Sequence, residues 1–213
     1  MSRPDPWTVG DDEERWRGYL IPPEHTVLRN LVGATSDEEL RAAENDLLEY
    51  RFAELREDPG LVPHTYDLDH VRNLHRQLFQ DVYPWAGELR TVGLTKGVGH
   101  PFLPPREIPT LVARVAQRIA RTDRLRQMPP PHLGRELAEL YDLLNYAHPF
   151  REGNGRSQRE FFAQLLAESG HRLAWDRIET SDLHFACEVA RNRGDRMYLL
   201  TIINTALSDH PGY

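Results

Sequence analysis

Residues 148–159 have the sequence HPFREGNGRSQR, which places a histidine, a glutamate, two glycines and two spaced arginines within twelve positions. Apolar residues at helical spacing precede and follow this run, so we expect it to form a loop between two helices, with its last part opening the second helix. The first backbone N–H groups of a helix have no partner within the helix and favour anions. These residues therefore predict an anion-binding site at residues 148–159.

Two side chains in this run have the chemistry to act on a bound phosphate ester. His148 comes just before Pro149, which disfavours helix at His148 and starts the loop. An imidazole can accept a proton from a hydroxyl near neutral pH. Glu152 offers a hard oxygen ligand suited to Mg²⁺, which needs only one or two carboxylates besides phosphate oxygens. We expect the apolar Phe150 to point into the core.

The remaining positions are suited to holding phosphate groups. Gly153 and Gly155 allow the backbone to approach a ligand closely, and Asn154 can donate an amide N–H to a phosphate oxygen. Arg156 and Arg159 are three residues apart on one helix, so both can reach the same triphosphate. Taken singly, each of these residues more often has a structural role. A simple turn, however, does not require His, Glu, Asn and two Arg in this order. The run therefore predicts transfer of part of a nucleoside triphosphate to a hydroxyl group.

The rest of the chain predicts a mainly α fold in one domain over residues 1–213. Residues 1–35 contain several prolines and are expected to be irregular. Residues 88–103 mix Leu, Thr and Val with three glycines, which favours a short β-hairpin beside the site. Helical spacing and breaking residues predict seven helices, over about residues 36–57, 67–79, 105–122, 132–146, 155–169, 181–191 and 195–208.

Composition limits the kinds of protein that the chain could be. The formal net charge of −7 argues against general binding to nucleic acid. No apolar stretch approaches the roughly 20 residues that span a bilayer, and the first ten residues lack a signal pattern, so we expect a soluble cytoplasmic protein. The single cysteine, Cys187, is expected to be a buried structural thiol and excludes a cysteine-based zinc site. Lys96 is the only lysine and falls within residues 88–103.

Residues 148–159 resemble the signature of the Fic family (filamentation induced by cAMP), His-x-Phe-x-(Asp/Glu)-Gly-Asn-Gly-Arg-x-x-Arg, at every fixed position. Residues 67–90 and 194–200 resemble further parts of this family, as does the pair Lys96-Gly97 in its "flap" hairpin. The resemblance implies a Fic-type helical bundle that moves AMP from ATP to a Ser, Thr or Tyr hydroxyl of a target protein.

The resemblance also implies a role for each site residue. His148 would be the general base, and Glu152 would hold Mg²⁺ at the phosphates. Residues 153–155 would form the anion hole, with Arg156 and Arg159 on the β- and γ-phosphates. Lys96 and Gly97 would contact nucleotide or target, because the flap is expected to pair with an extended target segment.

Many Fic proteins carry an inhibitory helix with the pattern (Ser/Thr)-x-x-x-Glu-(Gly/Asn), whose glutamate pairs with the last arginine of the signature. The nearest match here is Thr35 to Glu39, but Leu40 follows where Gly or Asn is needed. The chain thus resembles the small class in which a separate antitoxin supplies this helix. By the same analogy, a type II topoisomerase is a candidate target.

Three alternatives stay open from the sequence. Transfer of another nucleotide such as UMP is compatible, because no base-contacting residue can be recognised. A related branch of the family transfers phosphate, but it departs from the pattern at the second glycine, and Gly155 is present here. A non-catalytic binding module would be favoured by a degenerate signature, whereas this one is intact.

Overall fold

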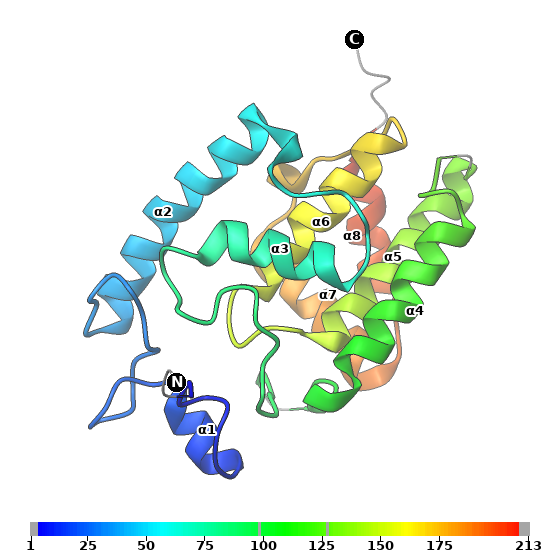
Figure 1. The fold of residues 1–213 in the computed structure, drawn as a ribbon. Helices are drawn as coiled ribbons and strands as arrows, with labels where there is room; N and C mark the ends of the chain where they lie inside the picture. Colours follow the sequence, from blue (N-terminus) through cyan, green and yellow to red (C-terminus); the bar gives the residue numbers. More distant parts are fainter. Residues whose placement is uncertain (1–3, 98, 127, 209–213) are drawn as a thin grey trace.

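We describe a computed structural model of the chain, which covers residues 4–97, 99–126 and 128–208. Helices dominate it, as predicted, and Figure 1 shows α3 and α6 lying between α2 on one side and α4 with α5 on the other. The α-helices are α1 Asp12–Gly18, α2 Asp37–Glu57, α3 Leu68–Phe79, α4 Ile108–Arg121, α5 Pro130–Ala147, α6 Asn154–Glu168, α7 Thr180–Arg193 and α8 Met197–Ala206. Short 3₁₀ turns occupy Pro59–Leu61, Pro105–Glu107 and Trp175–Arg177, and the strands are β1 Arg172–Leu173 and β2 Leu207–Ser208.

Helix α5 lies at the centre of the core, because four helices pack against it: α4, α6, α7 and α8. Its apolar residues at helical spacing are buried as the sequence predicted, namely Leu133, Leu137, Leu140, Tyr141 and Leu144. The apolar residues of α6 that were expected to face the core are buried too, namely Phe161, Phe162, Leu165 and Leu166. Cys187 is a buried free thiol, as predicted. Packing of α5 against α6 fixes the ends of the loop that joins them.

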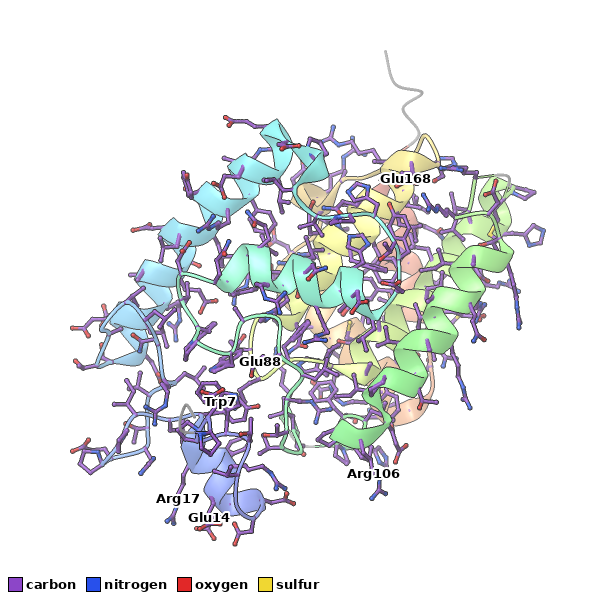
Figure 2. All side chains as sticks on the ribbon, in the orientation of Figure 1. Trp7, Glu14, Arg17, Glu88, Arg106 and Glu168 are labelled. Carbon is purple, nitrogen blue, oxygen red and sulfur yellow. The ribbon has the colours of Figure 1, made fainter. Side chains whose placement is uncertain are left out.

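The N-terminal segment differs from the expectation for residues 1–35. It contains the seven-residue helix α1, which begins with a capping box between Asp11 and Glu14. Trp7 donates its indole N–H to Glu88, 2.9 Å away, and Figure 2 shows these two side chains next to each other. Thr91 donates to the carbonyl of Trp7, and its own N–H donates to the Tyr19 hydroxyl at 3.1 Å. This segment therefore braces the start of residues 88–103.

The predicted β-hairpin at residues 88–103 does not form paired strands in the part of this segment that the structure describes. In this described part, one backbone hydrogen bond links two residues of the segment, from the N–H of Phe102 to the carbonyl of Leu94 at 2.9 Å. Pro101 lacks the N–H that a regular ladder would need there. Val98 lies outside the described residues. In the described parts of the chain the paired sheet is instead β1 with β2, antiparallel, with Leu173 opposite Leu207.

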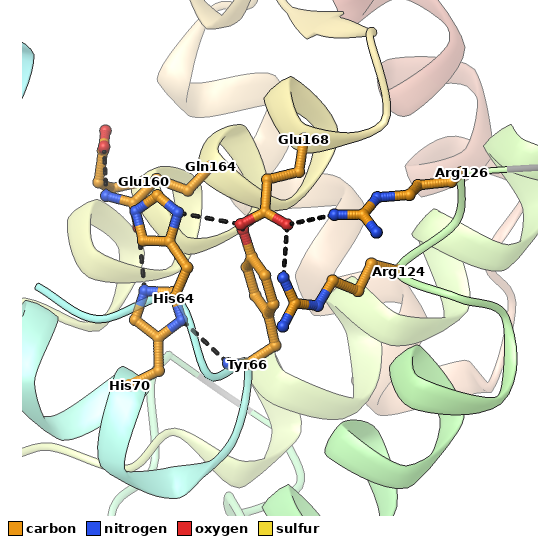
Figure 3. A network of polar contacts seen from close by, with 8 residues as sticks. All are labelled: His64, Tyr66, His70, Arg124, Arg126, Glu160, Gln164 and Glu168. Carbon is orange, nitrogen blue, oxygen red and sulfur yellow. Dashed lines mark hydrogen bonds and ion pairs between the residues drawn. The ribbon is translucent and has the colours of Figure 1, made fainter. Parts of the chain in front are cut away.

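A polar cluster joins the C-terminal end of α6 to two loops (Figure 3). Glu168 accepts hydrogen bonds from Arg124 at 2.7 Å and from Arg126 at 3.1 Å, and the Tyr66 hydroxyl donates to it at 2.9 Å. His64 Nδ1 lies 3.1 Å from the same carboxylate. The cluster stabilises the end of α6 that is remote from residues 148–159. None of the helices that the structure describes is both long and apolar enough to cross a bilayer.

Candidate active site

The loop between α5 and α6 is shaped by two residues with positive φ. His148 caps the end of α5 at φ 41°, and Gly153 precedes α6 at φ 82°. A Cβ atom on Gly153 would lie 2.5 Å from the Phe79 ring and 3.1 Å from His75 Nε2, so only glycine fits there. The close approach of α3 to this turn therefore sets where α6 begins.

His75, on α3, supports the loop between α5 and α6 by a hydrogen bond and by ring stacking. Its Nδ1 accepts the N–H of Gly87 at 2.8 Å, so the ring proton is on Nε2, which donates to the Glu152 carbonyl at 2.9 Å. The imidazole also stacks on Phe150, with ring centroids 3.7 Å apart. Burial lowers the pKa of His75 to about 3, so the ring is neutral. The helical spacing of the apolar residues in 68–79 predicts that His75 faces the core, but nothing in the sequence indicated its contact with the loop.

The side chain of Asn154 has a structural role in the loop that was not expected from the sequence. Its Oδ1 accepts the N–H of Phe150 and its Nδ2 donates to the carbonyl of Phe150, both at 2.8 Å. These two bonds close the loop, and because Nδ2 carries two N–H groups, one donor remains after the bond to Phe150. Phe150 points into the core, as predicted. The backbone N–H of Asn154, at the start of α6, is a further donor for an anion.

His148 is held at three places. Its Nδ1 lies 3.3 Å from the carbonyl of Asn145, and its ring stacks on Phe102 with 3.7 Å between centroids and 12° between planes. Its carbonyl accepts Nε of Arg90 at 2.7 Å. Burial, with the charge of Arg90 as a smaller cause, lowers the pKa of His148 to about 3, so the ring is neutral. If Nδ1 carries the proton for Asn145, Nε2 keeps a lone pair that can accept another.

Arg90 connects the loop to the flap segment, which we define as residues 88–103. Its guanidinium donates to the carbonyls of Val92 at 2.7 Å, Ala147 at 3.3 Å and Leu103, in addition to its bond to His148. The side chain is buried, and burial lowers its pKa to about 10, which still leaves it charged at neutral pH. One side chain thus ties both ends of the flap segment to the end of α5.

The two signature arginines have different surroundings. Arg156 forms an ion pair with Glu44 of α2, lies 3.7 Å from Glu152 through the same nitrogen, and packs 5.0 Å above the Phe79 ring. Among the described residues, no carboxylate forms an ion pair with Arg159. Sequence reasoning missed Glu44. The signal was its position, four residues from both Leu40 and Leu48, which puts a charge on the buried face of α2.

All but one of the predicted site residues line one cavity of about 710 Å³. These are Lys96, His148, Glu152, Gly153, Asn154, Gly155, Arg156 and Arg159. Gly97 lines a neighbouring cavity of about 330 Å³, which shares Lys96, His148, Gly155 and Arg159 with the first. Helix α2 supplies a wall that the sequence did not predict, including Arg41, Glu44 and Asn45.

The flap segment is fastened to α7 beside this cavity. Arg191 donates to the carbonyl of Lys96 at 3.0 Å, and its guanidinium lies 4.5 Å from the centroid of the Phe102 ring. Asn192 accepts the N–H of His100 at 2.9 Å. Because Phe102 also stacks on His148, α7 and the imidazole are joined through one aromatic ring.

Among the described residues, three acidic ones line the cavity. Of these, Glu152 belongs to the loop and could hold a divalent cation there, while Glu44 pairs with Arg156 and Asp37 lies at the start of α2. The Glu152 side chain is 47% exposed, and its Oε1 accepts the N–H of Gly153 at 2.9 Å. The described residues contain no group of three or more His, Cys, Asp or Glu that could hold a metal ion. This donor set fits Mg²⁺ brought in with phosphate oxygens and water, since Mg²⁺ is commonly bound through one or two carboxylates.

Residues 65–166 match the Fic/DOC family, and this segment contains α3 to most of α6 and the whole cavity loop. The chain belongs to the Fic/DOC family. It is 33% identical over 161 residues to the probable protein adenylyltransferase Fic of Escherichia coli, covering 76% of this chain and 78% of that protein.

Two further comparisons agree with membership of the Fic/DOC family. The chain is 35% identical over 161 residues to protein adenylyltransferase VbhT of Bartonella schoenbuchensis, where the match covers 76% of this chain but only 33% of the relative. The crystal structure of BepC from Bartonella tribocorum with bound AMPPNP superposes with a TM-score of 0.83 and 23% identity, covering 92% of this chain and 98% of that one. The predicted Fic-type helical fold is thereby confirmed.

Proposed function

We propose that this chain is a protein adenylyltransferase, which moves AMP from ATP to a hydroxyl side chain of a target protein and releases pyrophosphate. One observation carries the proposal. The neutral imidazole of His148, the first turn of α6 and the two arginines Arg156 and Arg159 line the same cavity. The curated relatives named as protein adenylyltransferases support the same activity.

Each residue has a defined part in this reaction. The free N–H groups at the start of α6 and the guanidinium groups of Arg156 and Arg159 hold the phosphate chain. His148 Nε2 accepts the proton of the target hydroxyl as its oxygen attacks the α-phosphorus, and the bond to pyrophosphate breaks. Glu152 would hold Mg²⁺, which when bound neutralises charge on the phosphate oxygens.

The presence of Gly155 argues for AMP transfer, because the branch of the family that transfers phosphate departs from the signature at this glycine. It is exposed at the first turn of α6, and a Cβ there would meet only Nη1 of Arg159, at 3.6 Å. The backbone at this position is thus open to a phosphate group. Transfer of UMP in place of AMP is the second candidate, and competition between the two labelled nucleotides distinguishes them.

We also propose the partners that this activity requires. The target presents a Ser, Thr or Tyr hydroxyl, and type II topoisomerases are the first candidates to test. A small helical antitoxin would restrain the enzyme by placing a carboxylate on Arg159, which has no carboxylate partner among the described residues. In this proposal the chain is the toxin of a toxin–antitoxin pair.

The proposal is tested by incubating the protein with a cell lysate and ATP labelled at either the α- or the γ-phosphate. Label on a protein band from the α-position alone supports adenylylation, and label from the γ-position indicates a kinase. His148→Ala is expected to abolish transfer. Transfer by this variant at the native rate would remove His148 as the base, and mass spectrometry of the labelled band identifies the target and the added mass.

A further inference from the structure

Glu44 is a buried carboxylate at the wall of the cavity, on a helix that lies outside the matched family segment. It is 6% exposed, yet both of its oxygens are engaged. Oε1 pairs with Nη2 of Arg156, and Oε2 accepts the hydroxyl of Tyr83 at 2.5 Å. A buried charge is costly unless it is paired and hydrogen-bonded, and Glu44 has both kinds of partner.

Tyr83 fixes the position of the Glu44 carboxylate. Its ring is buried and stacks on Trp85, with 4.3 Å between centroids and 15° between planes. Burial, followed by the charge of Glu44, raises the pKa of the Tyr83 hydroxyl, which keeps its proton and donates it to the carboxylate. The Glu44 carboxylate that pairs with Arg156 is therefore held in place by a buried, stacked tyrosine.

The guanidinium of Arg156 is constrained in two directions. The Phe79 ring covers one of its faces, and Glu44 takes one of its nitrogens. Arginine has five N–H donors in a planar fork, so donors remain for a phosphate group after this pairing. A long side chain at a cavity wall would otherwise lose rotamer freedom when it binds a ligand.

We propose that Glu44 is a positioning residue, which holds the Arg156 guanidinium ready for the phosphate chain of the nucleotide. This inference rests on the proposed function of the cavity. It differs from the restraint expected of an inhibitory glutamate, because Glu44 pairs with the first signature arginine and leaves Arg159 without a carboxylate among the described residues. When the charge of Glu44 is removed, a positioning role predicts weaker nucleotide binding and a restraining role predicts tighter binding.

The test is calorimetric titration of the full chain with ATP and Mg²⁺. Glu44→Gln keeps the volume and the acceptor for Tyr83 but removes the charge that orients Arg156. We expect the Kd for ATP to rise about tenfold, within the range of measured couplings between contacting residues. The matched control is Glu49→Gln on the same helix, where the side chain is exposed, and it should leave the Kd unchanged.

A double-mutant cycle separates positioning from a general loss of structure. In an Arg156→Ala background, Glu44→Gln should change the Kd no further, because its effect acts through Arg156. In steady-state transfer assays, Glu44→Gln should raise the KM for ATP more than it lowers kcat. Tyr83→Phe, which frees the carboxylate from its hydroxyl donor, should weaken ATP binding in the same direction.

Three outcomes would overturn the inference: an unchanged Kd for Glu44→Gln, a tighter Kd that shows competition with phosphate, or an equal loss with and without Arg156. The affinity readout does not depend on transfer. ATP binding with a Glu44 effect but without labelled protein would refute the proposed function alone. Transfer of label with no Glu44 effect would refute this inference alone.

Discussion

The ring of Phe102 lies parallel to the imidazole of His148, 3.7 Å away, and the guanidinium of Arg191 lies against Phe102 at 4.5 Å from its centroid. The orientation of the proposed base thus depends on a flap residue and, through it, on α7. Phe102→Leu removes the flat surface but keeps an apolar side chain. We expect transfer of labelled AMP to fall about tenfold, at a cost of about 1–2 kcal/mol in stability.

Phe185→Leu is the matched control for this substitution, because Phe185 is 54% exposed and contacts Tyr198 rather than His148. It should leave the transfer rate unchanged. The two variants are compared in kcat and in calorimetric ATP affinity. An equal transfer rate for Phe102→Leu and the native chain would show that the stacking does not orient the base.

Two buried histidines, His70 and His75, and the partly buried His148 predict a loss of stability in mild acid. Burial is the main cause that lowers the pKa to about 3 in His75 and His148 and to about 4 in His70. In the unfolded chain the imidazoles have pKa values near 6.5, so they bind protons at a pH where the folded imidazoles do not. The free energy of unfolding therefore has its full value above about pH 6.5 and falls as the pH drops below it. At pH 5.5 each of the three groups lowers the free energy of unfolding by about 1.4 kcal/mol relative to its value above pH 6.5.

Urea unfolding at pH 7.5 and 5.5 measures this difference in the free energy of unfolding. His148→Asn removes one of the three groups and should reduce the pH dependence by about one third of its value. A free energy that is equal at the two pH values would show that these rings accept protons in the folded state.

The two glycines of the loop should respond differently to alanine. Gly153→Ala places a Cβ 2.5 Å from Phe79 at a backbone φ of 82°, and we expect it to lower the free energy of unfolding by about 2–4 kcal/mol. Gly155→Ala adds a Cβ that meets only Arg159, at 3.6 Å, inside α6. It should raise stability by about 0.5 kcal/mol and weaken ATP binding by covering the backbone.

Each glycine variant controls for the other, with thermal unfolding and ATP calorimetry as the two measurements. Similar loss of stability in both variants would contradict the steric argument. Unchanged ATP affinity in Gly155→Ala would show that the phosphate chain does not approach the first turn of α6.

The Glu168 cluster predicts a variant that affects stability without affecting the site. Glu168→Gln removes the charge that pairs with Arg124 and Arg126, and we expect the protein to lose about 1–2 kcal/mol of stability. Glu168 is the last residue of α6, fourteen residues from Asn154, or about 21 Å at the helical rise. The Kd for ATP should therefore stay the same.

Exposed Glu57, which forms no ion pair in the described part of the chain, provides the comparison. Glu57→Gln should change the melting temperature by less than Glu168→Gln. A weaker ATP affinity in Glu168→Gln would show that the two ends of α6 are coupled.

Most helices could be predicted from the sequence because their apolar residues repeat at helical spacing and their ends carry local signals. The capping box at Ser36 and Glu39 starts α2 as expected, and the sequence placed the start of α6 within one residue. Helix α1 was missed because it is short and lies among prolines, although Asp11 and Glu14 form the same kind of capping box. Tyr50 continues the helical spacing of Leu40, Ala43 and Leu47 in α2, which predicts burial, but it is 59% exposed.

The residues of the loop could be named from the sequence, but their contacts could not. The pairing of Glu44 with Arg156 joins residues 112 positions apart, and no local pattern sets such a distance. The structural bonds of the Asn154 side chain could not be foreseen for a related reason. Its residue type permits either a ligand contact or a bond to the loop backbone, and only the folded position of Phe150 decides between them.

Arg90 reaches four carbonyl oxygens with a single planar group, and these belong to both ends of the flap segment and to the end of α5. A lysine has one nitrogen and could not span the same set. The segment that we propose to meet the target and the histidine that we propose as the base are thereby held by one side chain. Substitutions elsewhere in residues 88–103 are expected to change which target segment binds and to leave His148 in place.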